Sequence, residues 1–107
     1  MNRRSSPTDV ELLAEESARR SILAAIALAL TEHRTVHELL YAAEDVDTAK
    51  VRLMERFEWT EHQALAVLDV QHRRLPTAER RRIFEVLADV DARVAELTAR
   101  VTRDHGE

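Results

Sequence analysis

The sequence predicts an all-α protein in which an antiparallel two-helix stalk is capped by a small knob of three short helices. Helix breakers are nearly absent, because the 107 residues include only one Gly and two Pro. Hydrophobic residues make up 45% and charged residues 34% of the chain, which is typical of a globular protein and not of a disordered one. Ala, Leu, Glu and Arg are abundant, and all four favour helix interiors.

The first predicted helix ends near Thr31 and has two candidate starts. Ser6–Pro7 would place a cap residue before a proline in the first turn, whereas Thr8 with Glu11 forms a capping box one register later. Apolar residues are sparse in the first half of this helix but almost continuous over residues 22–30. We therefore expect the helix to begin exposed and to end inside the core.

Three short helices should follow, and each begins at a residue type that caps helix N-termini. In two of them a Glu or Gln stands three residues after the cap, which completes a capping box. The predicted starts are the Thr35–Glu38 box, Asp45 or Asp47, and the Thr60–Gln63 box, and the predicted ends lie near Ala43, Phe57 and Arg73.

The last predicted helix begins at Pro76–Thr77 and runs to about Arg103. Its apolar residues alternate at spacings of four and three, which is the seam of a coiled coil. They are Ile83, Leu87, Val90, Val94, Leu97 and Val101. Such a seam needs a partner helix, and the first helix has the matching length. We expect these two helices to pair antiparallel as the stalk.

One domain is predicted over residues 7–103, with a disordered N-terminal tail at residues 1–6 and a C-terminal tail at residues 104–107. No internal repeat or linker interrupts it. The apolar stretch Ile22–Leu30 is about half the length that a membrane-spanning helix needs, and it lacks the leading basic region of a signal peptide. We expect a cytoplasmic protein without a membrane association.

The composition excludes several kinds of chemistry. The chain has no Cys, so disulfides, thiolate metal sites and cysteine nucleophiles are excluded. The net charge of −4 argues against strong direct binding of nucleic acid. Several Arg residues surround Pro76, but Glu79 and Glu85 lie among them, so we interpret this segment as a solvated turn.

The segment Leu53–Asp69 reads LMERFEWTEHQALAVLD. It is similar to a segment of type IIA topoisomerase A subunits, the family of the DNA gyrase A subunit, in which Leu-Met-x-x-Phe-Gly-Leu-Ser-Glu-x-Gln-Ala-x-Ala-Ile-Leu-Asp precedes a Leu-Thr-x-Leu-Glu element. The resemblance covers roughly residues 20–100, and downstream it continues without a gap through Arg74, Leu75, Glu79, Arg80 and Ile83.

The resemblance implies a stand-alone, non-catalytic module. In gyrase-like A subunits this segment is the small globular domain at the tip of a paired coiled coil, where two copies meet as the exit gate for DNA. The cleavage residues of those proteins lie in another region, so the resemblance carries over no catalytic residue. The departures are Glu58 in place of Gly, Trp59 in place of Leu, Gln71 and His72 in place of a basic residue and Leu, and Pro76–Ala78 in place of Thr-Gly-Leu.

A second, independent argument predicts a dimer. Residues 64–70 are apolar nearly all round a helix, and such a helix must be covered on every side. The knob offers few helices to cover it, so we expect a partner surface, most simply a second copy of the chain. The predicted contact residues are Trp59, Gln63, Ala64, Val67, Leu68 and Gln71.

Two other functions stay open at this point. The chain could be a regulatory partner or decoy that binds a full-length topoisomerase A protein, or a small helical dimeric enzyme. Tyr41, the only Tyr, is expected to pack at the edge of the knob and not to act as a nucleophile. His33 and His37 have a metal-binding spacing, but a cap at Thr35 would separate them. We therefore predict no metal site, cofactor or catalytic residue.

Overall fold

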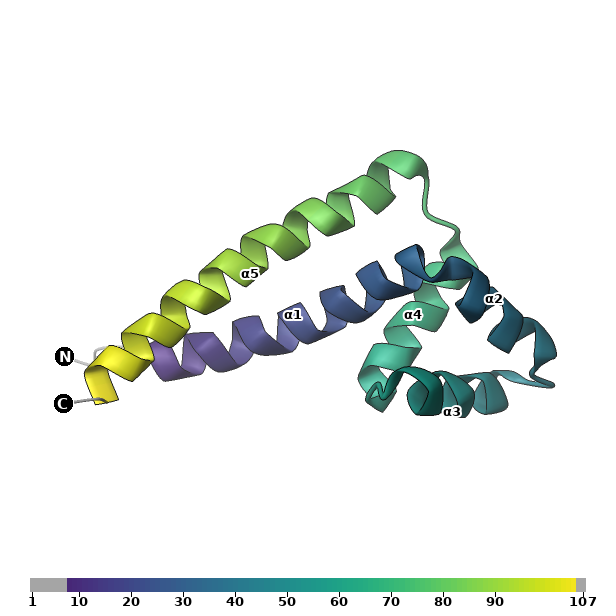
Figure 1. Ribbon diagram of the computed structural model, residues 1–107, viewed down its shortest axis with the longest axis horizontal. Coiled ribbons are helices and arrows are strands. Elements are labelled where there is room, and N and C mark those ends of the chain that lie inside the picture. The colour runs from purple at the N-terminus through teal and green to yellow at the C-terminus, as the bar shows by residue number, and fades with distance from the viewer. Residues whose placement is uncertain (1–7, 106–107) are drawn as a thin grey trace, which may run out of the picture.

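The computed structural model describes residues 8–105, and in this range it contains five helices and no strand (Figure 1). The long helices α1 and α5 run antiparallel as a stalk, and the three short helices pack at the end where α1 finishes (Figure 1). This arrangement confirms the predicted fold class. The helices are α1 (Asp9–Thr31), α2 (His33–Ala42), α3 (Val46–Phe57), α4 (Glu61–Arg73) and α5 (Thr77–His105).

Helix α1 begins in the later of the two predicted registers. The backbone N–H of Glu11 donates to the Thr8 hydroxyl at 3.1 Å, and the backbone N–H of Thr8 donates to the Glu11 carboxylate at 2.7 Å. These two bonds satisfy donors that the first helical turn leaves free. The bond from the Thr8 backbone N–H, followed by the contact of the Thr8 side chain with the carboxylate, lowers the pKa of Glu11. The alternative cap at Ser6–Pro7 and the predicted tail at residues 1–6 lie outside the described residues.

The stalk is held by the predicted apolar seam. Val90 and Leu97 of α5 are buried, and the other four seam residues are half-buried. Three ion pairs join the two helices in an antiparallel order: Arg20 with Asp91, Glu16 with Arg93 at 3.6 Å, and Asp9 with Arg100 at 3.6 Å. Exposed ion pairs contribute at most about 1 kcal/mol each, so they fix the register while the seam provides most of the stability.

The core of the knob forms around the apolar end of α1. Ala25 and Ala29 of α1 are buried against residues from all three short helices. The largest fully buried side chains are those of Val36, Leu53 and Val67, one from each of α2, α3 and α4. Because alanine is small, α1 can approach α2 and α4 closely. The nearly continuous apolar stretch in α1 is therefore explained by packing on several sides.

Two of the short helices begin at the predicted caps. At the start of α3, the backbone N–H of Thr48 donates to the Asp45 carboxylate at 2.8 Å, which lowers the pKa of Asp45. At the start of α4, Thr60 and Gln63 form a complete capping box with bonds of 2.8 and 3.2 Å. Side-chain caps thus determine where these helices start, as the sequence predicts.

Helix α2 differs from the prediction. It begins at His33 without a side-chain cap, and Thr35 lies within its first turn. The reason is that α1 continues almost directly into α2: the backbone N–H of Glu32 donates to Leu28, and that of Val36 donates to Glu32. The junction supplies its own backbone partners, so no capping side chain is needed. Helix α5 also continues past the predicted end, to His105.

Between residues 8 and 105, two residues other than glycine adopt the left-handed conformation, one at the end of each of two helices. Glu58 ends α3 with φ 57° and Arg74 ends α4 with φ 55°. Left-handed residues commonly end helices, and glycine is favoured there because it lacks a Cβ. Glu58 occupies the position at which gyrase-like subunits carry Gly, so this departure leaves the turn in place at a conformational cost.

Replacing Glu58 with Gly is therefore expected to stabilise the fold. A non-glycine residue in the left-handed conformation destabilises the folded chain by about 1–2 kcal/mol. Gly avoids this cost, but its greater freedom stabilises the unfolded chain, so the net rise in the free energy of unfolding is about 0.5–1 kcal/mol. Urea unfolding followed by circular dichroism measures the change. Glu55→Gly is the matched control, because the same change inside α3 should cost about 1 kcal/mol. A loss of stability in Glu58→Gly would contradict the expectation.

Candidate protein–protein interface

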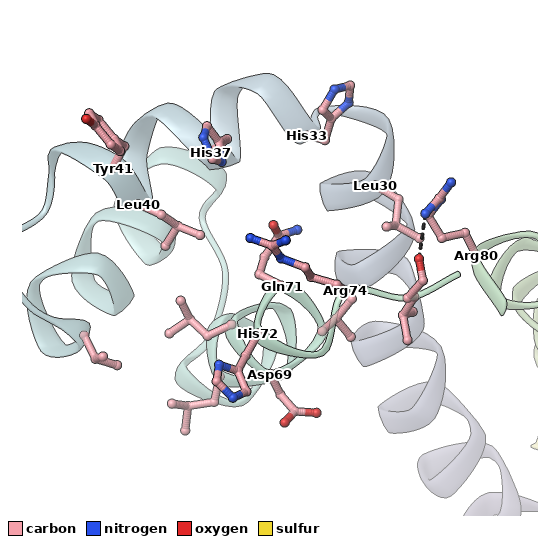
Figure 2. A pocket seen from close by; sticks show the side chains of 15 residues that line it. Leu30, His33, His37, Leu40, Tyr41, Asp69, Gln71, His72, Arg74 and Arg80 are labelled. Atoms are coloured by element: carbon pink, nitrogen blue, oxygen red, sulfur yellow. Dashed lines mark hydrogen bonds between the residues drawn. The ribbon is translucent and has the colours of Figure 1, made fainter. Parts of the chain in front are cut away.

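An open groove lies between α2, α4 and the turn that leads into α5 (Figure 2). Its volume is about 1250 Å³. The end of α1, the start of α3 and the start of α5 complete its walls. The lining residues are Leu30, His33, His37, Leu40, Tyr41, Val46, Leu65, Leu68, Asp69, Val70, Gln71, His72, Arg74, Leu75 and Arg80.

The groove contains an apolar surface that the chain itself leaves uncovered. Tyr41 is 86% exposed, Val46 68% and Leu65 45%. Leu40 and Leu68 lie beside them and are half-buried. Single exposed apolar side chains are ordinary, but several that gather in one concave surface are typical of an interaction site. The groove is therefore the strongest candidate for a contact with another protein.

Helix α4 explains why this surface exists. Ala64, Val67 and Val70 are buried in the core, although Val70 also borders the groove, and Leu65 and Leu68 line the groove. The sequence predicts that this apolar helix is covered on every side. The core of the same chain covers one of those sides. The side that carries Leu65 remains open to the groove.

Of the six predicted contact residues, four make contacts within the chain itself and two line the groove. Trp59, Ala64 and Val67 are buried within a single chain and belong to its core. The Gln63 side chain donates to the backbone carbonyl of Ser21 at 2.9 Å and so ties α4 to α1. Leu68 and Gln71 alone line the groove.

Sequence reasoning missed three groove residues with large exposed side chains. Leu65 lies in the same apolar run as Leu68. A helical projection of α4 that assigns Ala64 and Val67 to the buried face would have placed Leu65 on the exposed face. Tyr41 and Val46 carry no such signal, because only the packing of α2 against α3 and of α3 against α4 brings them to the groove. The sequence predicts that Tyr41 packs at the edge of the knob, but its ring is exposed and stacks against His37 with 6.3 Å between ring centroids.

The polar residues of the groove are mostly basic. His33 and His37 come from α2, His72 from α4, and Arg74 and Arg80 from the segment around the turn (Figure 2). The Arg80 guanidinium is held in place by bonds to the Leu75 carbonyl at 2.6 Å and the Thr77 hydroxyl at 3.0 Å. The single carboxylate of the groove, Asp69, is paired with Arg73 at 3.1 Å. The groove thus carries a positive balance although the whole chain has a net charge of −4.

The geometry of the two α2 histidines corrects the sequence argument about metal binding. His33 and His37 lie one turn apart on the same helix, because no cap at Thr35 separates them. A metal ion usually takes three or more protein ligands. Over residues 8–105, no group of three or more His, Cys, Asp or Glu side chains is placed to hold an ion.

Within the described part of the chain, no helix combines the length and the apolar character that crossing a bilayer requires.

Comparisons with known proteins identify relatives of the chain. No family model matches it. The DNA gyrase A subunit of Dehalogenimonas lykanthroporepellens is 42% identical over 73 residues, which cover 68% of this chain and 9% of that protein. The Mycobacterium tuberculosis protein of the same name is 40% identical over 85 residues, covering 79% of this chain and 10% of the relative. The Halalkalibacterium halodurans protein is 36% identical over 93 residues, covering 87% of this chain and 11% of the relative.

These matches agree with the resemblance that the sequence motif indicates. The chain spans about a tenth of the length of the relatives it matches. Over most of its own length, the chain is thus homologous to one segment of the DNA gyrase A subunit.

Proposed function

We propose that this chain is a non-catalytic dimerisation module related to the exit gate of the DNA gyrase A subunit, and that a second copy occupies the groove between α2 and α4. The observation that carries the proposal is the uncovered apolar surface formed by Tyr41, Val46 and Leu65. Burial of such side chains is the main driving force of association. The predicted contact residues Leu68 and Gln71 belong to the same groove.

The spacing of residues on α4 supports a symmetric contact. Leu65, Leu68, Asp69 and His72 follow one another at helical positions i, i+3, i+4 and i+7, so they form one stripe along the groove side of the helix. In a two-fold dimer the same surface meets itself. Antiparallel pairing of two such stripes would place the leucines of each copy against the other copy and leave the polar ends at the rim.

The groove residues do not form a recognisable catalytic arrangement. Nucleophilic catalysis requires a nucleophile in hydrogen-bond contact with a base. Among the described residues, the hydroxyl of Tyr41 makes no such bond, and its ring only stacks on His37.

Changing Leu65 to Asp should separate the dimer without unfolding the chain. Leu65 is 45% exposed, so the monomer tolerates a carboxylate there, whereas a dimer would have to bury the charge. Removal of a central interface contact typically costs about 2 kcal/mol or more, so we expect the Kd for dimerisation to rise at least about tenfold. Sedimentation equilibrium at micromolar concentrations measures this Kd, and Leu68→Asp should act in the same direction.

Val51→Asp is the matched control for this experiment. Val51 is 47% exposed, but it lies on α3 outside the groove. The proposal expects a Kd close to that of the unchanged chain. A folded, monomeric wild-type chain at pH 8 would overturn the proposal, as would equal weakening by Val51→Asp and Leu65→Asp.

The second candidate function is binding to a full-length gyrase A protein. The observation that favours it is the 36–42% identity to those proteins, which makes a mixed contact between homologous surfaces chemically reasonable. Adding purified gyrase A protein to the sedimentation experiment separates the candidates. A mixed complex that Leu65→Asp abolishes supports binding to gyrase, and its absence beside a stable homodimer supports dimerisation alone.

A further inference from the structure

We infer that Arg80 is a positioning residue of the groove: its guanidinium fixes the turn between α4 and α5, and the fixed turn gives the groove the shape that a second copy of the chain binds. The inference rests on the proposed dimer and adds how its binding surface is formed before contact. It is carried by two hydrogen bonds that the Arg80 side chain makes within this turn.

The turn between α4 and α5 forms one wall of the groove. Arg74, Leu75 and Arg80 all line it, and they come from the end of α4, from the turn itself and from the first turn of α5. The side chain of Leu75 also packs against the core of the knob. A shift of this turn would therefore move both the basic residues of the wall and the apolar side chain between them.

Helix packing alone does not hold this wall. In the part of the chain that the structure describes, α5 approaches α1 closely and none of the three short helices. The ion pairs that join α5 to α1 lie in the half of the stalk away from the knob, between residues 9–20 and 91–100. Ile83 anchors α5 to the core one turn further along the helix. The segment from Arg74 to Arg80 thus depends on hydrogen bonds of its own.

Arg80 supplies those hydrogen bonds. Its guanidinium donates to the Leu75 carbonyl at 2.6 Å, as Figure 2 shows, and to the Thr77 hydroxyl at 3.0 Å. Its backbone N–H donates to the Pro76 carbonyl at 2.9 Å. No backbone N–H between residues 8 and 105 donates to the Leu75 carbonyl, so the guanidinium is the protein donor that this carbonyl has. One arginine thus ties three consecutive residues of the turn to the start of α5.

The conformation of the turn needs such support. Arg74 adopts the left-handed conformation with φ 55°, which is unfavourable for a residue with a Cβ and persists only where the surroundings hold it. Pro76 has a fixed φ, which removes freedom from the middle of the turn. Thr77 stands where gyrase-like subunits carry Gly, so the hydroxyl that accepts from Arg80 is a feature in which this chain departs from them. The planar guanidinium carries its donors in a fixed arrangement and can bridge both acceptors at once.

A fixed wall strengthens association. Ordering mobile groups on contact weakens binding, and a surface that already has its bound shape avoids this cost. A two-fold dimer contains two such grooves, so both copies benefit. The guanidinium bonds to a neutral carbonyl and a neutral hydroxyl, and no ion pair is involved. The contribution of Arg80 should therefore persist at high salt.

Two substitutions remove the bonds to different extents. Arg80→Ala removes both side-chain bonds and introduces a residue that favours helices. Thr77→Val removes only the hydroxyl acceptor and keeps the shape of the side chain. Arg81→Ala is the matched control, because Arg81 is an exposed arginine in the same turn of α5 but lies outside the groove.

Sedimentation equilibrium measures the Kd of each variant in 0.1 M and 1 M salt, where screening acts over about 10 Å and 3 Å. We expect Arg80→Ala to raise the Kd about three- to tenfold at both salt concentrations, the usual effect of ordering one long side chain on binding. Thr77→Val should raise it less, and Arg81→Ala should leave it close to that of the unchanged chain.

A second measurement separates positioning from direct contact with the partner. Leu65→Asp keeps the copies apart, so nuclear magnetic relaxation in that background reports the turn without a partner. Adding Arg80→Ala should lower the backbone order parameters of Leu75 and Thr77 from about 0.85, the value of a rigid backbone, toward about 0.6. The urea midpoint should stay the same, because Arg80 is exposed and lies outside the core.

The outcomes separate the inference from the proposed function. A folded, monomeric unchanged chain overturns the dimer and the role of Arg80 in it. A dimer whose Kd is unaffected by Arg80→Ala leaves the proposed function standing and overturns the positioning role. A raised Kd with unchanged order in the turn also overturns the inference, because Arg80 would then act by touching the partner, and so does an equal rise in Arg81→Ala.

Discussion

Trp59→Ala is expected to lower the free energy of unfolding by about 3–5 kcal/mol, the usual cost of removing a buried aromatic side chain. Trp59 is only 8% exposed, and its ring stacks on Phe57 with 4.4 Å between ring centroids. Its backbone N–H donates to the Met54 carbonyl at 3.1 Å and so closes the end of α3. The side chain thus covers the core at the point where α3 turns into α4, and its removal leaves a cavity between them.

This result would also decide what Trp59 does in the assembly. As a contact residue, it would affect association and leave the stability of a single chain unchanged; as a core residue, it affects folding first. Urea unfolding followed by circular dichroism measures the loss. Two protein concentrations are needed, because unfolding of a dimer depends on concentration. Phe84→Ala is the control: Phe84 is an exposed aromatic residue and should change stability by less than about 1 kcal/mol.

Leu53→Ala is expected to destabilise the chain by about 2–5 kcal/mol. Leu53 is fully buried and is among the largest side chains in the centre of the knob. Truncation removes apolar contacts and leaves a cavity that the surrounding helices fill only in part. For a domain of this size, each kcal/mol lowers Tm by roughly 4–8 °C.

Thermal and urea unfolding of Leu53→Ala measure this effect, with Val51→Ala as the control on the same helix. Val51 is exposed, so its truncation should change stability by about 0.5 kcal/mol or less. Equal losses in the two variants would mean that the knob has no specific core at Leu53. A loss in Leu53→Ala alone would identify the point at which α3 is anchored.

Much of the fold could be predicted because local chemistry decides it. The seam on α5 and the caps at Thr8, Asp45 and Thr60 each act within a few residues of sequence, and the structure confirms them. The start of α2 could not be predicted in this way. Thr35 and Glu38 have the residue types and the spacing of a capping box. The helix nevertheless begins at His33, because the continuation of α1 through Glu32 supplies backbone hydrogen-bond partners for its first turn.

The candidate site was less accessible to sequence reasoning. The sequence of an apolar helix shows that its surface must be buried. It does not show which face is buried by other helices of the same chain. Trp59, Ala64 and Val67 look like the rest of their segment and turn out to be core, whereas Tyr41 and Val46 come from other helices.

The sequence by itself determined that this protein is all-helical, that its first and last helices pair, and that it is related to the DNA gyrase A subunit, because periodicity, caps and motifs are properties of neighbouring residues. Only the tertiary structure decided which apolar residues remain uncovered. Packing of α1 against α4 buries Ala64 and Val67 and leaves Leu65 at the groove. The meeting of residues from α2 and α4 at that groove has the same origin, since it depends on the tertiary packing and not on their spacing in the chain.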